Sequence, residues 1–208
     1  MNMVKAINFR KNVKMEILQL HYLHPYTAKL IPQIPRYFIE KYTQKNDILL
    51  DPFCGSGTTL LEGKILGRNA IGIDINPLAV LISQVKATSI EYDELKMVVK
   101  AVIEDIQKRR GKIMVDFPNI DYWFSKKAQE ELSVIKFAIE SLRGSINEEI
   151  YKFLLLCFSA IIRKSSYADP KMAKTYKSKR VIEKIRTGWE PEPIKYFEDI
   201  RGCPAIHS

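Results

Sequence analysis

The sequence predicts an α/β fold in which a parallel sheet is followed by a helical insertion. Two short apolar runs, Ile48–Leu50 and Ala70–Ile75, flank a helical pattern. A strand, a helix and a second strand within about 30 residues form a βαβ unit, whose strands run parallel. Further along the chain, apolar residues recur at helical spacing, with Leu95, Val99 and Val102 as the first examples.

The elements can be placed in chain order from local signals. Residues 21–46 begin as a loop with several prolines and become helical near Pro35. The run Ile48–Leu50 is typical of a buried parallel strand. A helix is expected over Thr58–Leu66 with Gly67 as its stop, then the strand Ala70–Ile75. The remaining helices share apolar residues at helical spacing and are expected from Pro77 to about Lys86, then at 93–110, 126–143 and 147–164.

The composition limits the classes of protein to which this chain can belong. The net charge of +9 and the pI of about 9.3 favour a polyanionic partner, nucleic acid first. Three cysteines without metal-ligand spacing indicate a reducing compartment, so we expect a cytoplasmic protein without a metal site. The apolar stretch Phe153–Ile162 is too short to span a bilayer, and the N-terminus has no apolar segment of signal-peptide length.

The turn "DPFCGSGTT" joins the first strand to its helix. Gly55 and Gly57 allow positive φ angles and close approach of the backbone to a ligand. The dinucleotide fingerprint requires a third glycine where Leu60 stands, and no lysine follows as in a phosphate-binding P-loop. The turn therefore fits neither a dinucleotide nor a nucleoside triphosphate.

Two acidic residues define the ligand more closely. Asp51, at the end of the first strand, can meet a cation, and the following helix N-terminus suits a carboxylate. Asp74, at the end of the second strand, can accept hydrogen bonds from two ribose hydroxyls. A ligand with an amino acid at one end and a ribose at the other is S-adenosylmethionine. The alternative is a tight turn that holds no ligand.

The segments "DPFCGSGTTLLEG" and "GIDINPLA" resemble the first two cofactor motifs of DNA methyltransferases that modify exocyclic amines, N4 of cytosine or N6 of adenine. The upstream segment "HPYTAKLIPQIPRYFIEKY" resembles the motif that one permutation of this family places before the first strand. The resemblance is specific over residues 21–87, continues more loosely to about Ser166, and implies a Rossmann-like methyltransferase fold.

The same resemblance implies roles for individual residues. Those expected at the methionine end of the cofactor are His24, Pro25, Tyr26, Ala28, Lys29, Asp51, Phe53, Gly55, Gly57 and Thr58. Asp74 would take the ribose, and Ile75 and Pro77 would flank the adenine. Cys54 is interpreted as a small residue tolerated in the turn, not as a nucleophile. We expect residues 1–92 to be the cofactor-binding part, 93–165 the helical insertion, and 166–208 a basic segment of unassigned fold.

In this family an Asp/Asn/Ser-Pro-Pro-aromatic motif positions the target amine, and the 208 residues contain none. No catalytic residue is therefore assigned, and the sheet is expected to be incomplete. The chain resembles the cofactor-binding half of such an enzyme, and a restriction-modification system is one context that the resemblance implies. A split gene with a second polypeptide, a truncated gene and an inactive cofactor-binding fragment remain open. An RNA guanine-N2 methyltransferase is the other enzyme class, although "HPYTAK" favours DNA.

The segment from Arg163 to Arg186 carries nine basic residues and two acidic ones. This density predicts contacts to nucleic-acid phosphates, for which the candidates are Lys174, Lys177, Lys179 and Arg180. The alternative is an ordinary solvated surface. Trp123 and Phe124 are interpreted as an aromatic pair packed between helices, with stacking on a base as the less favoured alternative.

Overall fold

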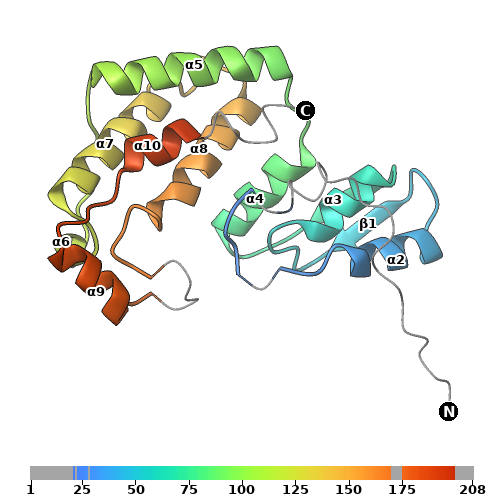
Figure 1. Ribbon diagram of the computed structural model, residues 1–208. Coiled ribbons are helices and arrows are strands. Elements are labelled where there is room, and N and C mark those ends of the chain that lie inside the picture. The colour runs from blue at the N-terminus through green and yellow to red at the C-terminus, as the bar shows by residue number, and fades with distance from the viewer. Residues whose placement is uncertain (1–20, 22, 28, 170–174, 200–208) are drawn as a thin grey trace. The chain divides into compact units, whose positions relative to one another are not determined.

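The computed structural model describes residues 21, 23–27, 29–169 and 175–199, which divide into two compact units (Figure 1). The first unit ends at Ala87 and the second begins at Thr88, except that residues 23–27 belong to the second. The predicted site residues Ala28 and Lys174 lie outside the described residues.

The first unit contains the predicted βαβ unit. Its elements in chain order are α2 (Gln33–Tyr42), β1 (Ile48–Asp51), α3 (Thr58–Ile65), β2 (Asn69–Gly72) and α4 (Pro77–Ala87). Strands β1 and β2 pair in parallel, with Ile48 opposite Asn69 and Asp51 opposite Gly72. Helix α3 crosses between them and packs on both strands. The α/β class with a parallel sheet is therefore confirmed.

Strand β2 is shorter than predicted. It ends at Gly72 and not at Ile75, although the amide of Ile73 still donates to the carbonyl oxygen of Asp51 (2.9 Å). The chain then turns because the Asp74 carboxylate accepts a hydrogen bond from the amide of Asn76 (2.8 Å). An aspartate that bonds a backbone amide two residues ahead forms a local turn that competes with the extended strand.

The prediction that the first strand is buried is wrong for one face of the sheet. Leu49 faces α3, where its side chain lies against Gly63. On the opposite face the side chains of Ile48, Leu50 and Ile71 are 69%, 63% and 53% exposed. A parallel sheet is normally covered on both faces. Within the described part of the first unit, helices cover only the α3 side of this sheet.

The second unit is helical. It contains α5 (Tyr92–Lys108), α6 (Ile120–Trp123), α7 (Lys126–Glu140), α8 (Glu148–Ile162), α9 (Lys179–Arg186) and α10 (Pro193–Glu198). Helices α5, α7, α8 and α10 pack on one another around Ile106, Ile135 and Leu154, each fully buried (Figure 1). The three helices predicted for this region are confirmed as α5, α7 and α8. Helices α9 and α10 lie in the segment to which the sequence assigned no fold.

No helix in the described part of the chain combines the length and the apolar character needed to cross a membrane. Likewise, no group of three or more histidine, cysteine, aspartate or glutamate side chains among the described residues is arranged to hold a metal ion.

Candidate cofactor site

The glycine turn between β1 and α3 is held in place by the end of β2. The Asp74 carboxylate accepts a hydrogen bond from the amide of Gly55 (2.8 Å) with one oxygen and from Asn76 with the other. The amide of Cys54 donates to the carbonyl oxygen of Ile73 (2.9 Å). The carboxyl ends of the two strands therefore form one ordered edge, where ligands of parallel sheets bind.

Gly57 occupies a position that only glycine can fill without strain. Its φ is +74°, in the left-handed region. A Cβ added there would lie 2.6 Å from Cβ and 2.7 Å from Cα of Ser83 on α4. The close approach that this glycine permits is therefore to helix α4, which fixes the start of α3 against its neighbour. Gly55, at φ +50°, is the second left-handed glycine of the turn.

Helix α4 also contributes a buried cation beneath the turn. Lys86 is 3% exposed, and its ammonium donates to the carbonyl oxygen of Ser56 (2.9 Å). Desolvation, with a smaller repulsion from Lys29, lowers the pKa of Lys86 to about 8. Burial likewise raises the pKa of the Cys54 thiol, which favours the unreactive protonated form over a nucleophilic thiolate.

We expect the first unit to become more stable as the pH rises from about 8 to 10.5, the ordinary pKa of Lys86. In this window the unfolded chain holds a proton on Lys86 that the folded chain has released, so the free energy of unfolding increases with pH. The increase should be on the order of 2–3 kcal/mol. Urea unfolding at pH 7.5, 9 and 10.5, followed through amide exchange in α3, measures it.

Two variants separate this effect from the titration of other groups. Lys86→Met removes the titrating ammonium and should remove most of the rise with pH. Lys45→Met changes an exposed lysine of the same unit and should keep the rise. An unchanged pH dependence in Lys86→Met would contradict the assignment of the titrating group to Lys86.

A cavity of about 210 Å³ opens beside the start of α3. It is lined by His21, Lys29, Leu30, Ile31, Pro32, Gln33 and Thr58. Lys29 and Thr58, two residues expected at the methionine end of the cofactor, therefore share one cavity. Oε1 of Gln33 is buried and accepts no hydrogen bond from the described residues. Burial lowers the pKa of Lys29, whose ammonium donates to the carbonyl oxygen of His21 (3.1 Å).

A buried ion pair fixes the wall of this cavity to α3. Glu62 is fully buried, and its carboxylate accepts hydrogen bonds from Nε2 of His21 (2.9 Å) and from Nε of Arg36 (2.6 Å). Removal of one member of such a pair leaves an uncompensated buried charge. Sequence reasoning missed Glu62, Arg36 and Lys86. The available signal was a charged residue at an inward-facing position of a predicted helix.

The remaining predicted cofactor residues divide between the two units. In the first unit Phe53 and Ile75 are the most exposed, at 88% and 102%, and Pro77 begins α4. The Asp51 carboxylate accepts a hydrogen bond from the amide of Phe53 (3.2 Å), which stabilises the start of the turn. The roles predicted for these residues remain predictions.

His24, Pro25 and Tyr26 belong to the second unit. His24 is buried there, with Nε2 at hydrogen-bond distance (3.1 Å) from Oγ of Ser159 on α8. The carbonyl oxygen of His24 accepts a hydrogen bond from the amide of Tyr26 (2.8 Å). Their predicted place along the methionine end remains a prediction.

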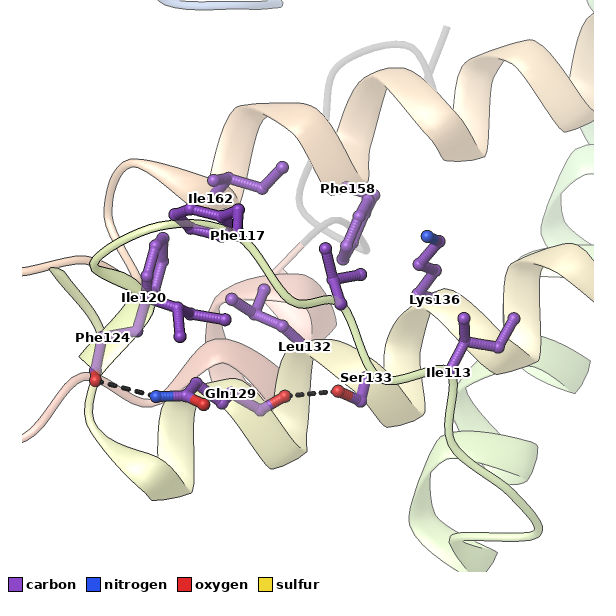
Figure 2. A pocket seen from close by; sticks show the side chains of 11 residues that line it. Ile113, Phe117, Ile120, Phe124, Gln129, Leu132, Ser133, Lys136, Phe158 and Ile162 are labelled. Carbon is purple, nitrogen blue, oxygen red and sulfur yellow. Dashed lines mark hydrogen bonds between the residues drawn. The ribbon is translucent and has the colours of Figure 1, made fainter.

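The second unit contains an apolar cavity of about 280 Å³ between α7 and α8 (Figure 2). Its walls include Phe124 and Phe158, and Phe117 meets Phe124 edge to face. The Gln129 amide donates to the carbonyl oxygen of Phe124 (3.2 Å), and the Ser133 hydroxyl donates to the carbonyl oxygen of Gln129 (2.6 Å). Phe124 therefore lines this cavity and is half-buried, and its interpretation as a packing residue remains a prediction. Its walls contain one cation, Lys136, but no carboxylate that could accept hydrogen bonds from the ribose of the cofactor.

The basic candidates of the second unit differ in their surroundings. The Lys177 ammonium lies 3.7 Å from the ring centroid of Tyr122 and 4.9 Å from that of Tyr167, and desolvation lowers its pKa. Lys177 is thus engaged with two aromatic rings. Lys179 and Arg180 are exposed at the start of α9, whose first turn contains no acidic residue.

Comparison with known protein families matches the region that contains the candidate cofactor site. A family model described as DNA methylase matches residues 6–85, which include both cofactor motifs. The predicted resemblance to amino-type DNA methyltransferases is therefore confirmed, and with the β1–α3–β2 unit it supports the Rossmann-like methyltransferase fold.

Three relatives carry the similarity beyond this region. The chain is 33% identical over 189 residues to Type II methyltransferase M.MvaI of Kocuria varians, covering 85% of this chain and 40% of the relative. It is 44% identical over 112 residues to Type II methyltransferase M.MjaII of Methanocaldococcus jannaschii, covering 54% and 18%. It is 28% identical over 210 residues to Type II methyltransferase M.BsoBI of Geobacillus stearothermophilus, covering 97% and 40%.

The chain thus spans less than half the length of these relatives. No solved structure matches it.

Proposed function

We propose that the first unit binds S-adenosylmethionine and that it serves methyl transfer to an exocyclic amine of cytosine or adenine in DNA. The observation that carries this proposal is the position of Asp74. Its carboxylate lies two residues beyond the end of β2 and accepts a hydrogen bond from the glycine turn that follows β1. Each carboxylate oxygen accepts one amide and has capacity for a further hydrogen bond, as two ribose hydroxyls require.

The cavity beside α3 can hold the other end of the ligand, its amino-acid end. The Lys29 ammonium and the positive end of the α3 dipole favour a carboxylate there. The buried Oε1 of Gln33 can accept a hydrogen bond from an amino group. The exposed side chain of Ile75 and Pro77 at the start of α4 offer apolar surface at the same edge of the sheet for the adenine, and Phe53 remains assigned to the methionine end. Residues of this unit therefore match the carboxylate, amine, ribose and base of the cofactor.

We further propose that a second polypeptide completes the enzyme and that the enzyme belongs to a restriction-modification system. The exposed sheet face supports this proposal, because Ile48, Leu50 and Ile71 present apolar surface that parallel sheets normally bury. A two-stranded sheet is also marginally stable without further strands or packing. DNA as the substrate is supported by the matched family. We propose the cytoplasm as the compartment, because three cysteines without metal-ligand spacing suit a reducing environment.

Calorimetry with S-adenosylmethionine tests the cofactor assignment. Asp74→Ala should weaken binding by about 1–3 kcal/mol, because the ribose hydroxyls and the Gly55 amide lose their acceptor. Asp74→Asn keeps one oxygen acceptor and should show an intermediate loss. Equal affinity of the wild-type chain and Asp74→Ala would contradict the role of Asp74. Glu91→Ala, an exposed acidic residue outside the first unit, is the control and should bind as the wild type does.

A further inference from the structure

We propose that a hollow between the end of α8 and helix α9 binds one phosphate of the DNA backbone, together with part of its sugar. The hollow is lined by Arg163, Lys164, Ser166, Ala168, Arg180, Val181, Lys184, Trp189 and Tyr196. Four of these side chains are cations, and two are aromatic. The choice of DNA as the polyanion rests on the proposed function, whereas the requirement for an anion comes from the residues themselves.

Secondary structure brings the cations together. Arg180 and Lys184 are four residues apart on α9, so their side chains lie on one face of the helix. Arg163 caps the end of α8, and its guanidinium donates to the carbonyl oxygen of Asp169 (3.1 Å). This bond orients the guanidinium at the end of α8.

Two of the acidic residues near the hollow pair with cations that do not line it. Glu183 pairs with Arg186 (3.7 Å) and Glu192 pairs with Lys195 (3.5 Å). Across the described residues, neither Lys164 nor Arg180 nor Lys184 forms an ion pair. The first turn of α9 adds to the positive potential, because it carries basic residues where the helix dipole is already positive. A bound anion would relieve this repulsion.

The size and the aromatic wall favour the backbone of a polymer over a free nucleotide. The hollow measures about 210 Å³. Sites for whole small molecules are typically larger, roughly 300–1,000 Å³. Trp189 packs near Tyr167, with ring centroids 6.4 Å apart, and the Lys184 ammonium lies 5.5 Å from the centroid of Trp189. A phosphate held by the cations would place its sugar against this indole.

Only some of the basic residues predicted from the sequence to contact nucleic acid line the hollow. Arg180 lines the hollow, whereas Lys179 on the same helix does not, and Lys177 is held between two tyrosine rings. A general electrostatic attraction would treat these lysines and arginines alike. With a phosphate subsite, loss of a cation that lines the hollow weakens binding more than loss of a cation outside it, and this difference in affinity is measurable.

The experiment compares two double variants of equal charge on α9. Anisotropy of a labelled mixed-sequence 12-bp DNA duplex is measured between 50 and 200 mM salt. Arg180→Gln with Lys184→Gln removes two cations of the hollow and should weaken binding about tenfold and lower the salt slope by about one. Lys179→Gln with Arg186→Gln removes two cations outside it and should weaken binding clearly less. Equal losses in the two double variants would overturn the proposal.

Two further measurements test whether DNA contacts the hollow and whether DNA is preferred to RNA. In a Trp123→Phe background Trp189 is the only tryptophan, and its emission should change when DNA is added; an unchanged emission contradicts contact at the hollow. An RNA duplex of equal length serves as competitor, and preferential binding of RNA would overturn the choice of DNA. Cofactor calorimetry on the α9 variants reports on the first unit, so failure of the cofactor assignment is recognised separately.

Discussion

The 208-residue chain, assayed alone, is expected to transfer no methyl group from S-adenosylmethionine to mixed-sequence DNA. The reason is the absence of an Asp/Asn/Ser-Pro-Pro-aromatic motif from these residues. Asp169-Pro170 is the nearest approach, but Lys171 replaces the second proline and Met172 the aromatic residue. Cofactor binding supplies a methyl group but does not position the amine that must attack it.

The expected loss is large because positioning contributes much of the rate. Bringing two reactants into a productive geometry is worth roughly 7–11 kcal/mol of the barrier. An exocyclic amine is also a weak nucleophile, since its lone pair is delocalised into the ring. The motif of this family accepts hydrogen bonds from that amine and stacks an aromatic ring on the extruded base. Without both contacts the extruded base is not held near the cofactor.

The assay measures transfer of labelled methyl with and without a second polypeptide that carries the motif. Transfer only in the mixture would establish a two-part enzyme. Transfer by the 208-residue chain alone would refute the expectation and direct attention to an acceptor site among its own residues. The Asp74→Ala variant is the matched control, because it should reduce any transfer that depends on the cofactor site.

Gly57→Ala is expected to destabilise the first unit by about 3 kcal/mol or more and to abolish measurable cofactor binding. A left-handed φ costs an alanine about 1–2 kcal/mol. The new Cβ would also lie 2.6 Å from Cβ and 2.7 Å from Cα of Ser83, so backbone of α4 must move. Overpacking of this kind adds about 1–3 kcal/mol. A displaced α4 would also move the Lys86 ammonium away from the glycine turn.

Gly67→Ala is the matched control in the same unit. Gly67 also has a left-handed φ, +76°, but its nearest neighbour is the flexible side chain of Lys45 at 3.7 Å. It should therefore show the conformational cost alone, with cofactor binding retained. Urea unfolding, followed by amide exchange in β1 and α3, gives the free energy of unfolding of the two variants. Equal destabilisation by the two alanines would show that the contact with Ser83 contributes nothing.

The sequence was sufficient for the features that depend on neighbours along the chain. The glycine turn, the strands around it, Gly67 as a helix stop and the three long helices all follow from local patterns, and the structure contains them. The end of β2 was placed three residues too far, because the apolar pattern continues to Ile75 while the Asp74 side chain turns the backbone. A period of two in apolar residues does not report a side chain that bonds its own backbone.

Only the tertiary structure decided which distant residues meet. Glu62 joins His21 and Arg36, Asp74 holds Gly55, and Lys86 lies beneath Ser56. Each pair is separated by between 19 and 41 positions, and nothing in a local pattern specifies a partner at that range. The buried environment that shifts the pKa of Lys86 arises from the packing of α4 on the turn, so it exists only once the chain has folded.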